Sequence, residues 1–150
     1  MGRLVPHKGP DWLLRATARV EAPIRLDVAG TGPERAALER LARSLGIADR
    51  VTFHGWLADD ALRRLVRNAR AVVFPSVWHE PAGLVSLEAA AHGRALVAGR
   101  VGGVPEYTSE ANAFLVPPRD VGALADRLAY LATHREAAAR MGRAGREWVE

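Results

Sequence analysis

The sequence predicts an α/β fold with three layers, in which helices cover both faces of a mostly parallel sheet. Short apolar runs alternate with amphipathic stretches along the whole chain, which is the pattern of βαβ units with right-handed crossovers. The runs are continuously apolar, as strands covered on both faces are. At 150 residues, with no linker rich in Pro, Gly or Ser, the chain is expected to form one domain.

Five apolar runs are the predicted strands: Ile24–Ala29, Val51–His54, Ala71–Phe74, Ala95–Ala98 and Ala113–Val116. Six longer stretches are the predicted helices: Asp11–Val20, Glu34–Leu45, Asp59–Asn68, Leu84–His92, Val121–Ala132 and Arg135–Val149. In the second of these helices the apolar side chains fall on one stripe of the 3.6-residue period. Gly46 follows and predicts the helix end, because glycine readily caps a helix in the left-handed conformation.

The sequence signals for a complete strand or helix are missing at both ends of the chain. Gly2–Val5 resembles the last part of a strand whose apolar beginning is absent, and the final helix reaches Glu150 without a Gly cap or a following Pro. We therefore expect residues 1–150 to be a single domain truncated at both ends and belonging to a longer protein. A short natural chain is the alternative.

The charge and the composition exclude several classes of protein. The 21 basic residues are Arg except for Lys8, and the net charge is +4. Asp and Glu are interleaved with the Arg residues, which favours solvated helix faces, and no basic block alternates with aromatics, so no nucleic-acid partner is expected. The absence of Cys excludes disulfides and thiolate zinc sites and fits a cytoplasmic location. No apolar run approaches the ~20 residues of a membrane span, and no signal peptide is recognisable.

The loop after the run Ala71–Phe74 carries the strongest functional signal. Pro81 and Gly83 lead into the next predicted helix, whose first amides lack intrahelical acceptors and lie at the positive end of the helix dipole. Glu80 precedes this anion-binding helix start, and Glu88 lies about 6 Å along the helix axis from its first residue. Carboxylates accept hydrogen bonds from hydroxyls, so the pair predicts a ligand with a phosphate centre and a hydroxyl-rich group on each side. A nucleotide-diphosphate sugar fits that description.

A second anion-facing feature lies near the amino terminus. Arg3 ends the strand-like segment, and Lys8 lies in the loop before the first predicted helix. Two cations at one strand end can neutralise a diphosphate leaving group as its negative charge develops. Either residue alone would be read as an ordinary surface charge.

The chain resembles the family 4 retaining glycosyltransferases of the GT-B fold, with the E-x7-E element at Glu80–Ala89. Further elements of the family occur in the same order and spacing along the chain: Gly2–Gly9, Ala29–Pro33, Val51–Leu57, Phe74–Ser76, Gly102–Glu106 and Leu115–Pro118. The resemblance implies a Rossmann-like domain, the carboxyl-terminal, donor-binding half of such an enzyme. Two positions depart from the family pattern: Ala82 stands where Phe is frequent, and Gly93–Ala95 lacks the usual Pro.

The resemblance also implies roles for individual residues. Arg3, Lys8 and Glu80 would be the catalytic group, in which the two cations hold the donor diphosphate and the carboxylate contacts the donor sugar. Backbone amides of Gly83, Leu84 and Val85 would bind the phosphates, and Glu88 would bind the ribose. The base pocket would be lined by Gly55, Trp56, Leu57, Pro75 and Ser76. Gly30 and Gly32 would shape a strand-to-helix turn near the nucleotide.

The resemblance further implies retaining hexosyl transfer from a UDP-, GDP- or ADP-sugar, without a cofactor or an obligatory metal. The acceptor would be held by a missing amino-terminal domain, so the chain alone would bind donor without transferring sugar. Any peripheral association with the inner face of a membrane would be made by missing regions.

Three other functions stay open. Gly30-Thr31-Gly32 after a strand resembles part of a dinucleotide fingerprint, as in an NAD-dependent oxidoreductase, although Arg35 stands where its third glycine would fall. A nucleotide-binding domain without catalysis is a second alternative. A glycoside hydrolase with Glu80 and Glu88 as its carboxylate pair is the third.

Overall fold

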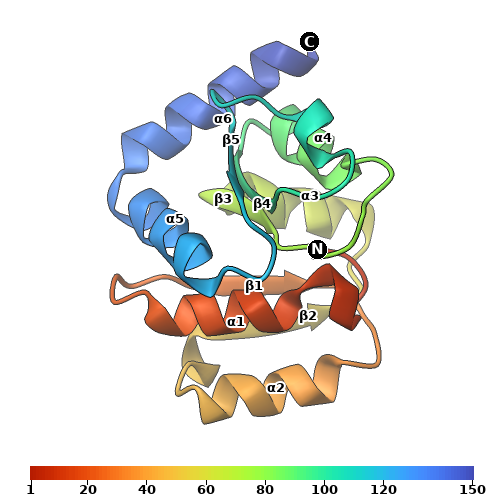
Figure 1. The fold of residues 1–150 in the computed structure, drawn as a ribbon, viewed down its shortest axis with the longest axis vertical. Helices are drawn as coiled ribbons and strands as arrows, with labels where there is room; N and C mark the ends of the chain where they lie inside the picture. Colours follow the sequence, from red (N-terminus) through yellow and green to blue (C-terminus); the bar gives the residue numbers. More distant parts are fainter.

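The computed structural model describes residues 1–150 and forms five strands and six α-helices (Figure 1). The strands are β1 (Leu26–Ala29), β2 (Val51–Gly55), β3 (Ala71–Phe74), β4 (Ala95–Gly99) and β5 (Ala113–Val116). The helices are α1 (Pro10–Arg19), α2 (Arg35–Ser44), α3 (Asp59–Asn68), α4 (Leu84–Ala91), α5 (Val121–Thr133) and α6 (Arg135–Val149). Three short 3₁₀ helices join them: η1 (Pro6–Lys8), η2 (Ala48–Arg50) and η3 (Val104–Tyr107).

Every predicted strand and helix is present, and most bounds agree within one residue. The largest difference is at the start of β1, which was expected at Ile24 and begins at Leu26. The carbonyl of Ile24 instead accepts a hydrogen bond from the Arg50 guanidinium, 3.3 Å away. Gly46 ends α2 as predicted, with a φ of +70°. The 3₁₀ helices were not predicted.

All strand pairings are parallel, as predicted, but the strands form two sheets instead of one. β1 pairs with β2, and β4 lies between β3 and β5. Figure 1 shows β1 and β2 in the lower half of the molecule with α1 and α2, and β3 to β5 above them. Gly2–Val5, expected as the end of a strand, forms no regular strand, yet the N–H of Gly2 donates to the carbonyl of Ala29 at 3.0 Å.

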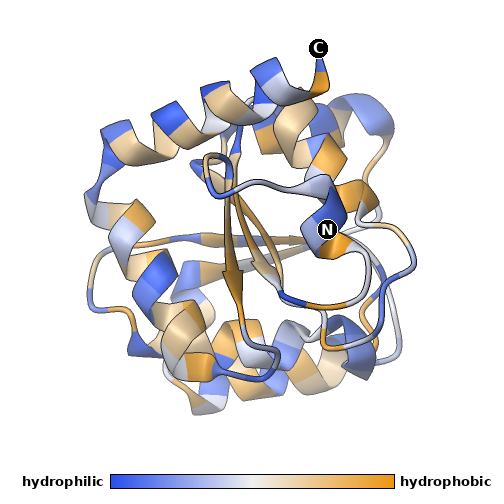
Figure 2. Cartoon of the chain, turned by 45° about the horizontal axis from the view of Figure 1, so that its top comes forward, coloured by the Kyte–Doolittle hydropathy of each residue, from blue (hydrophilic) through white to orange (hydrophobic).

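Strand β4 is the centre of the larger half, since all five of its residues are buried. Ala95 and Val97 face a cluster with α1, α5 and α6, whereas Leu96 and Ala98 face a cluster with α3 and α4. Figure 2 shows the central strands coloured mainly as hydrophobic between helices that also carry hydrophilic residues. This arrangement is the predicted three-layer sandwich. None of the helices is long and apolar enough to cross a bilayer.

A third cluster fills the smaller half, where α1 and α2 pack together beneath the amino-terminal segment. Leu14 of α1 lies in this cluster with Leu38 of α2, whereas Leu13 of α1 lies in the cluster around β4. Helix α1 therefore contributes buried side chains to both halves of the molecule.

Several Arg side chains depart from the expected solvated role and bond to main-chain carbonyls, among them Arg50, Arg70 and Arg94. The guanidinium of Arg50 donates to the carbonyls of Thr17 and Val20 as well as to that of Ile24. Arg70 bonds to the end of α5, and Arg94 donates to the carbonyl of Ala69 at 3.1 Å. These charges therefore join loops to helix ends, which composition alone does not indicate.

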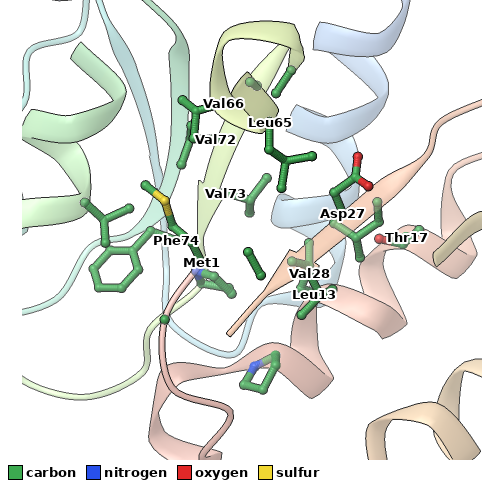
Figure 3. A pocket seen from close by; sticks show the side chains of 18 of the residues that line it. Met1, Leu13, Thr17, Asp27, Val28, Leu65, Val66, Val72, Val73 and Phe74 are labelled. Carbon is green, nitrogen blue, oxygen red and sulfur yellow. The ribbon is translucent and has the colours of Figure 1, made fainter. Parts of the chain in front are cut away.

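A cavity of about 610 Å³ lies between the two sheets (Figure 3). Residues of β1 and of β3 line it from two sides, and Met1 lies among them. Most of its lining is hydrophobic. The cavity also reaches the carboxyl ends of the strands, where Lys8 and Glu80 contribute to its wall.

The α-amino group of Met1 provides a test of the burial at this cavity. Desolvation lowers its pKa, and the negative charge of Glu88 opposes that shift in part. The unfolded chain then holds this proton more tightly than the folded chain, so stability is expected to rise with pH from the lowered pKa up to the ordinary value of 8.0. Urea unfolding followed between about pH 6 and about pH 8.5 measures the rise. Acetylation of the amino terminus should remove this contribution, and an identical pH dependence in the acetylated chain would contradict it.

Candidate functional site

The candidate site lies where two chain segments pack against each other at the carboxyl ends of the strands. One segment is η1 with the turn that follows it, and the other is the loop between β3 and α4. The N–H of Val77 donates to the carbonyl of His7 at 3.0 Å. Gly9 lies so close to the carbonyl of Pro75 that a Cβ atom would collide with it, and its φ is +71°. The position of Lys8 relative to the β3–α4 loop is therefore fixed by the main chain on both sides.

Lys8, Ser76 and Glu80 form one hydrogen-bonded group. The Nζ atom of Lys8 lies 2.6 Å from Oε1 and 2.9 Å from Oε2 of Glu80. The Ser76 hydroxyl donates to Oε1 of Glu80 at 2.6 Å. The Glu80 residue is only 6% exposed, whereas the Lys8 side chain is 30% exposed. A buried carboxylate is thus held between a hydroxyl and an ammonium that can still be reached from the cavity.

The main chain of Glu80 is held in place by a glycine pair after β4. The N–H of Gly103 donates to the carbonyl of Glu80 at 2.8 Å. Gly102 has a φ of +49°, and a Cβ atom there would collide with the main chain of Glu80. The sequence analysis noted these glycines only as part of a family element and gave them no role. Two consecutive glycines in the loop after a strand were the available signal, because that pattern indicates a close approach of two backbone segments.

The start of α4 lies beside this group. Gly83 precedes the helix, and the N–H of Ser86 donates to the carbonyl of Gly83 at 2.7 Å. The amides of Gly83, Leu84 and Val85 have no backbone acceptor. Leu84 and Val85 line the same cavity as Lys8 and Glu80. Residues with free amides at a helix start and an ammonium group therefore line one cavity, which is an arrangement suited to an anion.

The two predicted cations lie at the same cavity but differ in their contacts. Arg3 is exposed and has no ion pair, whereas Lys8 is paired with Glu80. Leu84 and Val85 of α4 line this cavity too. The structure pairs Lys8 with Glu80, and Arg3 lines the same cavity as both of them. Their contact with a diphosphate stays a prediction.

The glycines of the turn between β1 and α2 are packed against the amino-terminal segment. A Cβ atom at Gly30 would collide with the carbonyl of Gly2, and one at Gly32 would collide with that of Leu4. The N–H of Glu34 also donates to the carbonyl of Leu4, at 3.2 Å. The two glycines shape a strand-to-helix turn, as predicted. The amino-terminal segment therefore packs directly against this turn.

The remaining predicted site residues are spread over the same end of the fold. Pro75 lines the cavity, and Gly55 ends β2 with a φ of +71°. Trp56 is exposed, Leu57 is half-buried, and Glu88 is exposed on α4. Ser76 differs from its predicted role in a base pocket, because its side chain is fully buried and its hydroxyl is bonded to Glu80. The position of Ser76 in the loop after β3 did not indicate that its hydroxyl bonds to Glu80.

The sequence is similar to those of known glycosyltransferases. The family model for glycosyl transferases group 1 matches residues 1–148. A GDP-mannose-dependent alpha-(1-6)-phosphatidylinositol monomannoside mannosyltransferase of Mycobacterium tuberculosis is 38% identical, in a match that covers 99% of this chain and 41% of the relative. A D-inositol 3-phosphate glycosyltransferase of Mycolicibacterium smegmatis is 39% identical, over 92% of this chain and 33% of the relative. The chain thus spans well under half the length of these two proteins.

Solved structures show the same fold. Sucrose-phosphate synthase from Thermosynechococcus elongatus superposes with a TM-score of 0.90 at 32% identity, covering 99% of this chain and 39% of that protein. The Anabaena protein HepE, solved in complex with UDP, superposes with a TM-score of 0.90 at 26% identity, covering 99% of this chain and 43% of that protein. With a family match over almost every residue, the chain belongs to the group 1 glycosyl transferases.

Proposed function

We propose that this chain is the carboxyl-terminal, donor-binding part of a retaining glycosyltransferase that uses a nucleoside-diphosphate sugar. The observation that carries the proposal is the Lys8–Glu80 pair beside the free amides of α4. A relative named as GDP-mannose-dependent and a neighbouring structure that contains UDP support a donor of this class.

The paired charges suggest how a donor binds. A diphosphate at the start of α4 would compete with Glu80 for the Lys8 ammonium, because both are anions. Arg3, which has no partner, would supply the second positive charge. An oxygen of Glu80 released from Lys8 could then accept a hydrogen bond from a sugar hydroxyl, while Ser76 keeps the carboxylate in position. One exchange of partners would thus couple phosphate binding to sugar recognition.

Transfer to an acceptor would need parts beyond this chain, namely the acceptor-binding domain that we propose for the whole protein. Lys8, Arg3 and the helix dipole would stabilise the departing diphosphate, so the proposal requires neither a metal nor a cofactor. The departing phosphate would assist deprotonation of the acceptor hydroxyl on the same face of the sugar, which corresponds to retention of configuration.

The oxidoreductase and hydrolase alternatives receive less support. The Gly30–Gly32 turn packs against the amino-terminal segment, and Arg35 stands where the third glycine of a dinucleotide fingerprint would fall. Glu80 and Glu88 differ in environment, because the first is buried on Lys8 and the second is exposed on α4. The remaining alternative, a nucleotide-binding domain without catalysis, would use the same donor site. It would differ from a transferase only in whether the whole protein transfers a sugar.

Calorimetry on the 150-residue chain tests the donor site. UDP, GDP, ADP, NAD and the matching nucleotide sugars are titrated into the wild-type chain and into Glu80→Gln. We expect at least one nucleoside diphosphate to bind more tightly than NAD. In Glu80→Gln, which frees Lys8, the affinity for that diphosphate is expected to rise about 3- to 10-fold, since one charge-assisted contact no longer competes.

The same variant is expected to lose most of the preference for the nucleotide sugar over the bare diphosphate, because an amide replaces the carboxylate acceptor. Glu88→Gln serves as the control on the exposed carboxylate of α4, and it should leave that preference unchanged. Tightest binding of NAD by the wild-type chain, or an unchanged sugar preference in Glu80→Gln, would contradict the proposed site.

A further inference from the structure

A second hollow lies next to the cavity between the two sheets, and we call it the η1 groove. Its volume is about 400 Å³. Pro10 lines both hollows, whereas Lys8 lines only the cavity and His7 lines only the groove. The side chains of the groove that can recognise a ligand are His7, Asp11, Trp12, Glu34, Trp78 and Arg119. None of them belongs to the proposed donor site, so the groove is a separate feature that shares a wall with it.

One wall of the η1 groove is aromatic and is held in place by the main chain. The ring centroids of His7 and Trp78 lie 5.7 Å apart, with the ring planes tilted by 56°. The N–H of Val77 donates to the carbonyl of His7, which joins the two segments that carry these rings. Trp78 is nevertheless 58% exposed. Its indole therefore presents an apolar face that a ligand in the groove can cover.

The groove also carries charged side chains of both signs that do not neutralise one another. Asp11 lies in the first turn of α1, and Glu34 lies directly before α2 without capping it through its side chain. Helix dipoles favour acids at these two places, and the carboxylate oxygens remain acceptors for hydroxyl groups. Arg119 adds a guanidinium donor, and none of the three residues takes part in an ion pair. The groove therefore offers both acceptors and donors to a ligand.

The backbone of Arg119 is held in a conformation that its side chain disfavours. Arg119 is the only residue other than glycine with a positive φ, at +65°. It lies in a turn closed by the N–H of Asp120, which donates to the carbonyl of Pro117 at 3.3 Å. Glycine is the residue that such a position favours, because it has no Cβ atom. Strain of this kind is concentrated at ligand sites, and here it is retained at the residue that supplies the donor of the groove.

We propose that the η1 groove binds a sugar unit of a glycan, separately from the nucleoside-diphosphate sugar. The C–H groups on one face of the sugar ring would rest on the indole of Trp78. Its hydroxyls would donate to Asp11 and Glu34 and accept from Arg119. The volume of the groove lies within the range of small-molecule sites, roughly 300–1,000 Å³. That this glycan is the acceptor or the product of the transfer rests on the proposed function.

Ions fit the η1 groove less well than a sugar does. The carboxylates of Asp11 and Glu34 repel a phosphate or another anion, and the guanidinium of Arg119 repels an organic cation. No three His, Asp or Glu side chains are close enough to hold a metal ion. A neutral ring with many hydroxyls uses the donor, the acceptors and the aromatic face together.

The test follows the four tryptophan indole N–H groups of the 150-residue chain by heteronuclear NMR. Methyl α-mannoside, methyl α-glucoside, mannotriose and maltotriose are titrated in turn. At least one of them is expected to shift the indole signals of Trp12 and Trp78 saturably, with a dissociation constant of about 1–10 mM. The signal of Trp148, which lies on α6 outside the groove, should stay in place.

Arg119→Gly is the sharpest variant, because it is expected to change stability and binding in opposite directions. Relief of the left-handed conformation should raise the thermal midpoint by about 2–4 °C, whereas loss of the guanidinium should weaken saccharide binding about 5-fold. Trp78→Ala should weaken saccharide binding by a similar factor, about 5-fold, because the ring face is lost. Arg100→Ala and Trp148→Ala are the matched controls, since both residues are exposed and neither lines the groove. They should leave the saccharide affinity within about twofold of the wild type.

Three results would overturn the proposal. The first is that none of the four saccharides shifts the signals of Trp12 and Trp78, or that the signal of Trp148 shifts equally. The second is an unchanged saccharide affinity in both Arg119→Gly and Trp78→Ala. The third is tighter binding of inorganic phosphate or spermidine at the same signals, which would assign the groove to an ion.

UDP, GDP and ADP are titrated into the same samples, so that the groove and the donor site are tested apart. Saccharide binding in the groove without binding of any nucleotide would count against the proposed function alone. Nucleotide binding without any saccharide shift would count against the groove alone.

Discussion

Replacing Lys8 with alanine is expected to weaken the binding of a nucleoside diphosphate by roughly 10- to 100-fold. The change removes the ammonium that pairs with Glu80 and leaves this buried carboxylate without its partner, beside the proposed position of the phosphates. The phosphates lose the attraction of the ammonium and meet the repulsion of the carboxylate, and both effects weaken binding. Calorimetry with the diphosphate and with the nucleoside alone measures the effect, and the nucleoside should bind almost as before.

Arg63→Ala is the matched control for charge, because Arg63 is exposed on α3 and forms no ion pair. It should leave the affinity for diphosphate within about twofold of the wild type, since surface charges far from a ligand are screened by salt. Equal losses for nucleoside and diphosphate in Lys8→Ala would show that the lysine supports the fold and does not contact phosphate.

Gly102→Ala is expected to be the most damaging single change in the main chain around the site. The residue has a φ of +49°, and the added Cβ would meet the carbonyl and amide groups of Glu80. Strain in the left-handed conformation and displacement of a neighbouring backbone together are expected to cost about 3 kcal/mol of unfolding free energy. Urea titration gives that value, and diphosphate-sugar binding should weaken because Glu80 is displaced.

Gly46→Ala separates the two causes. Gly46 has a φ of +70° at the end of α2, but no atom lies within 4 Å of the position that a Cβ would take. This variant should therefore show the conformational cost alone, about 1 kcal/mol. A loss of similar size in both variants would mean that contact with Glu80 adds nothing at Gly102.

The helices and strands were predictable because each depends on local pattern. The bounds of α3 and α6 match the prediction, since apolar periodicity and adjacent acids mark them within the segment itself. The start of β1 was not predictable in the same way. Pairing with β2 begins at Leu26, and the carbonyl of Ile24 accepts from Arg50 of η2, so both partners are distant in the sequence.

The candidate site was also predictable only in part. The residues that meet at the cavity were identified because their elements end at one edge of a parallel arrangement. Their pairing was not identified: Lys8 and Glu80 are 72 positions apart, and the sequence indicated only that both face an anion. Ser76 was assigned to a base pocket through the family resemblance, and its position in the loop after β3 gives no indication of the direction of its hydroxyl. The split into two sheets also depends on distances between strands, which no local pattern encodes.

Helix α1 has a consequence for how the molecule melts. No strand of one sheet pairs with a strand of the other, so the two halves are coupled mainly through side chains, and α1 places Leu13 in one cluster and Leu14 in the other. Cooperative unfolding requires that loss of one half lowers the stability of its neighbour. Adjacent leucines on α1 supply part of that linkage, and Leu26 of β1, which packs against both clusters, supplies another part.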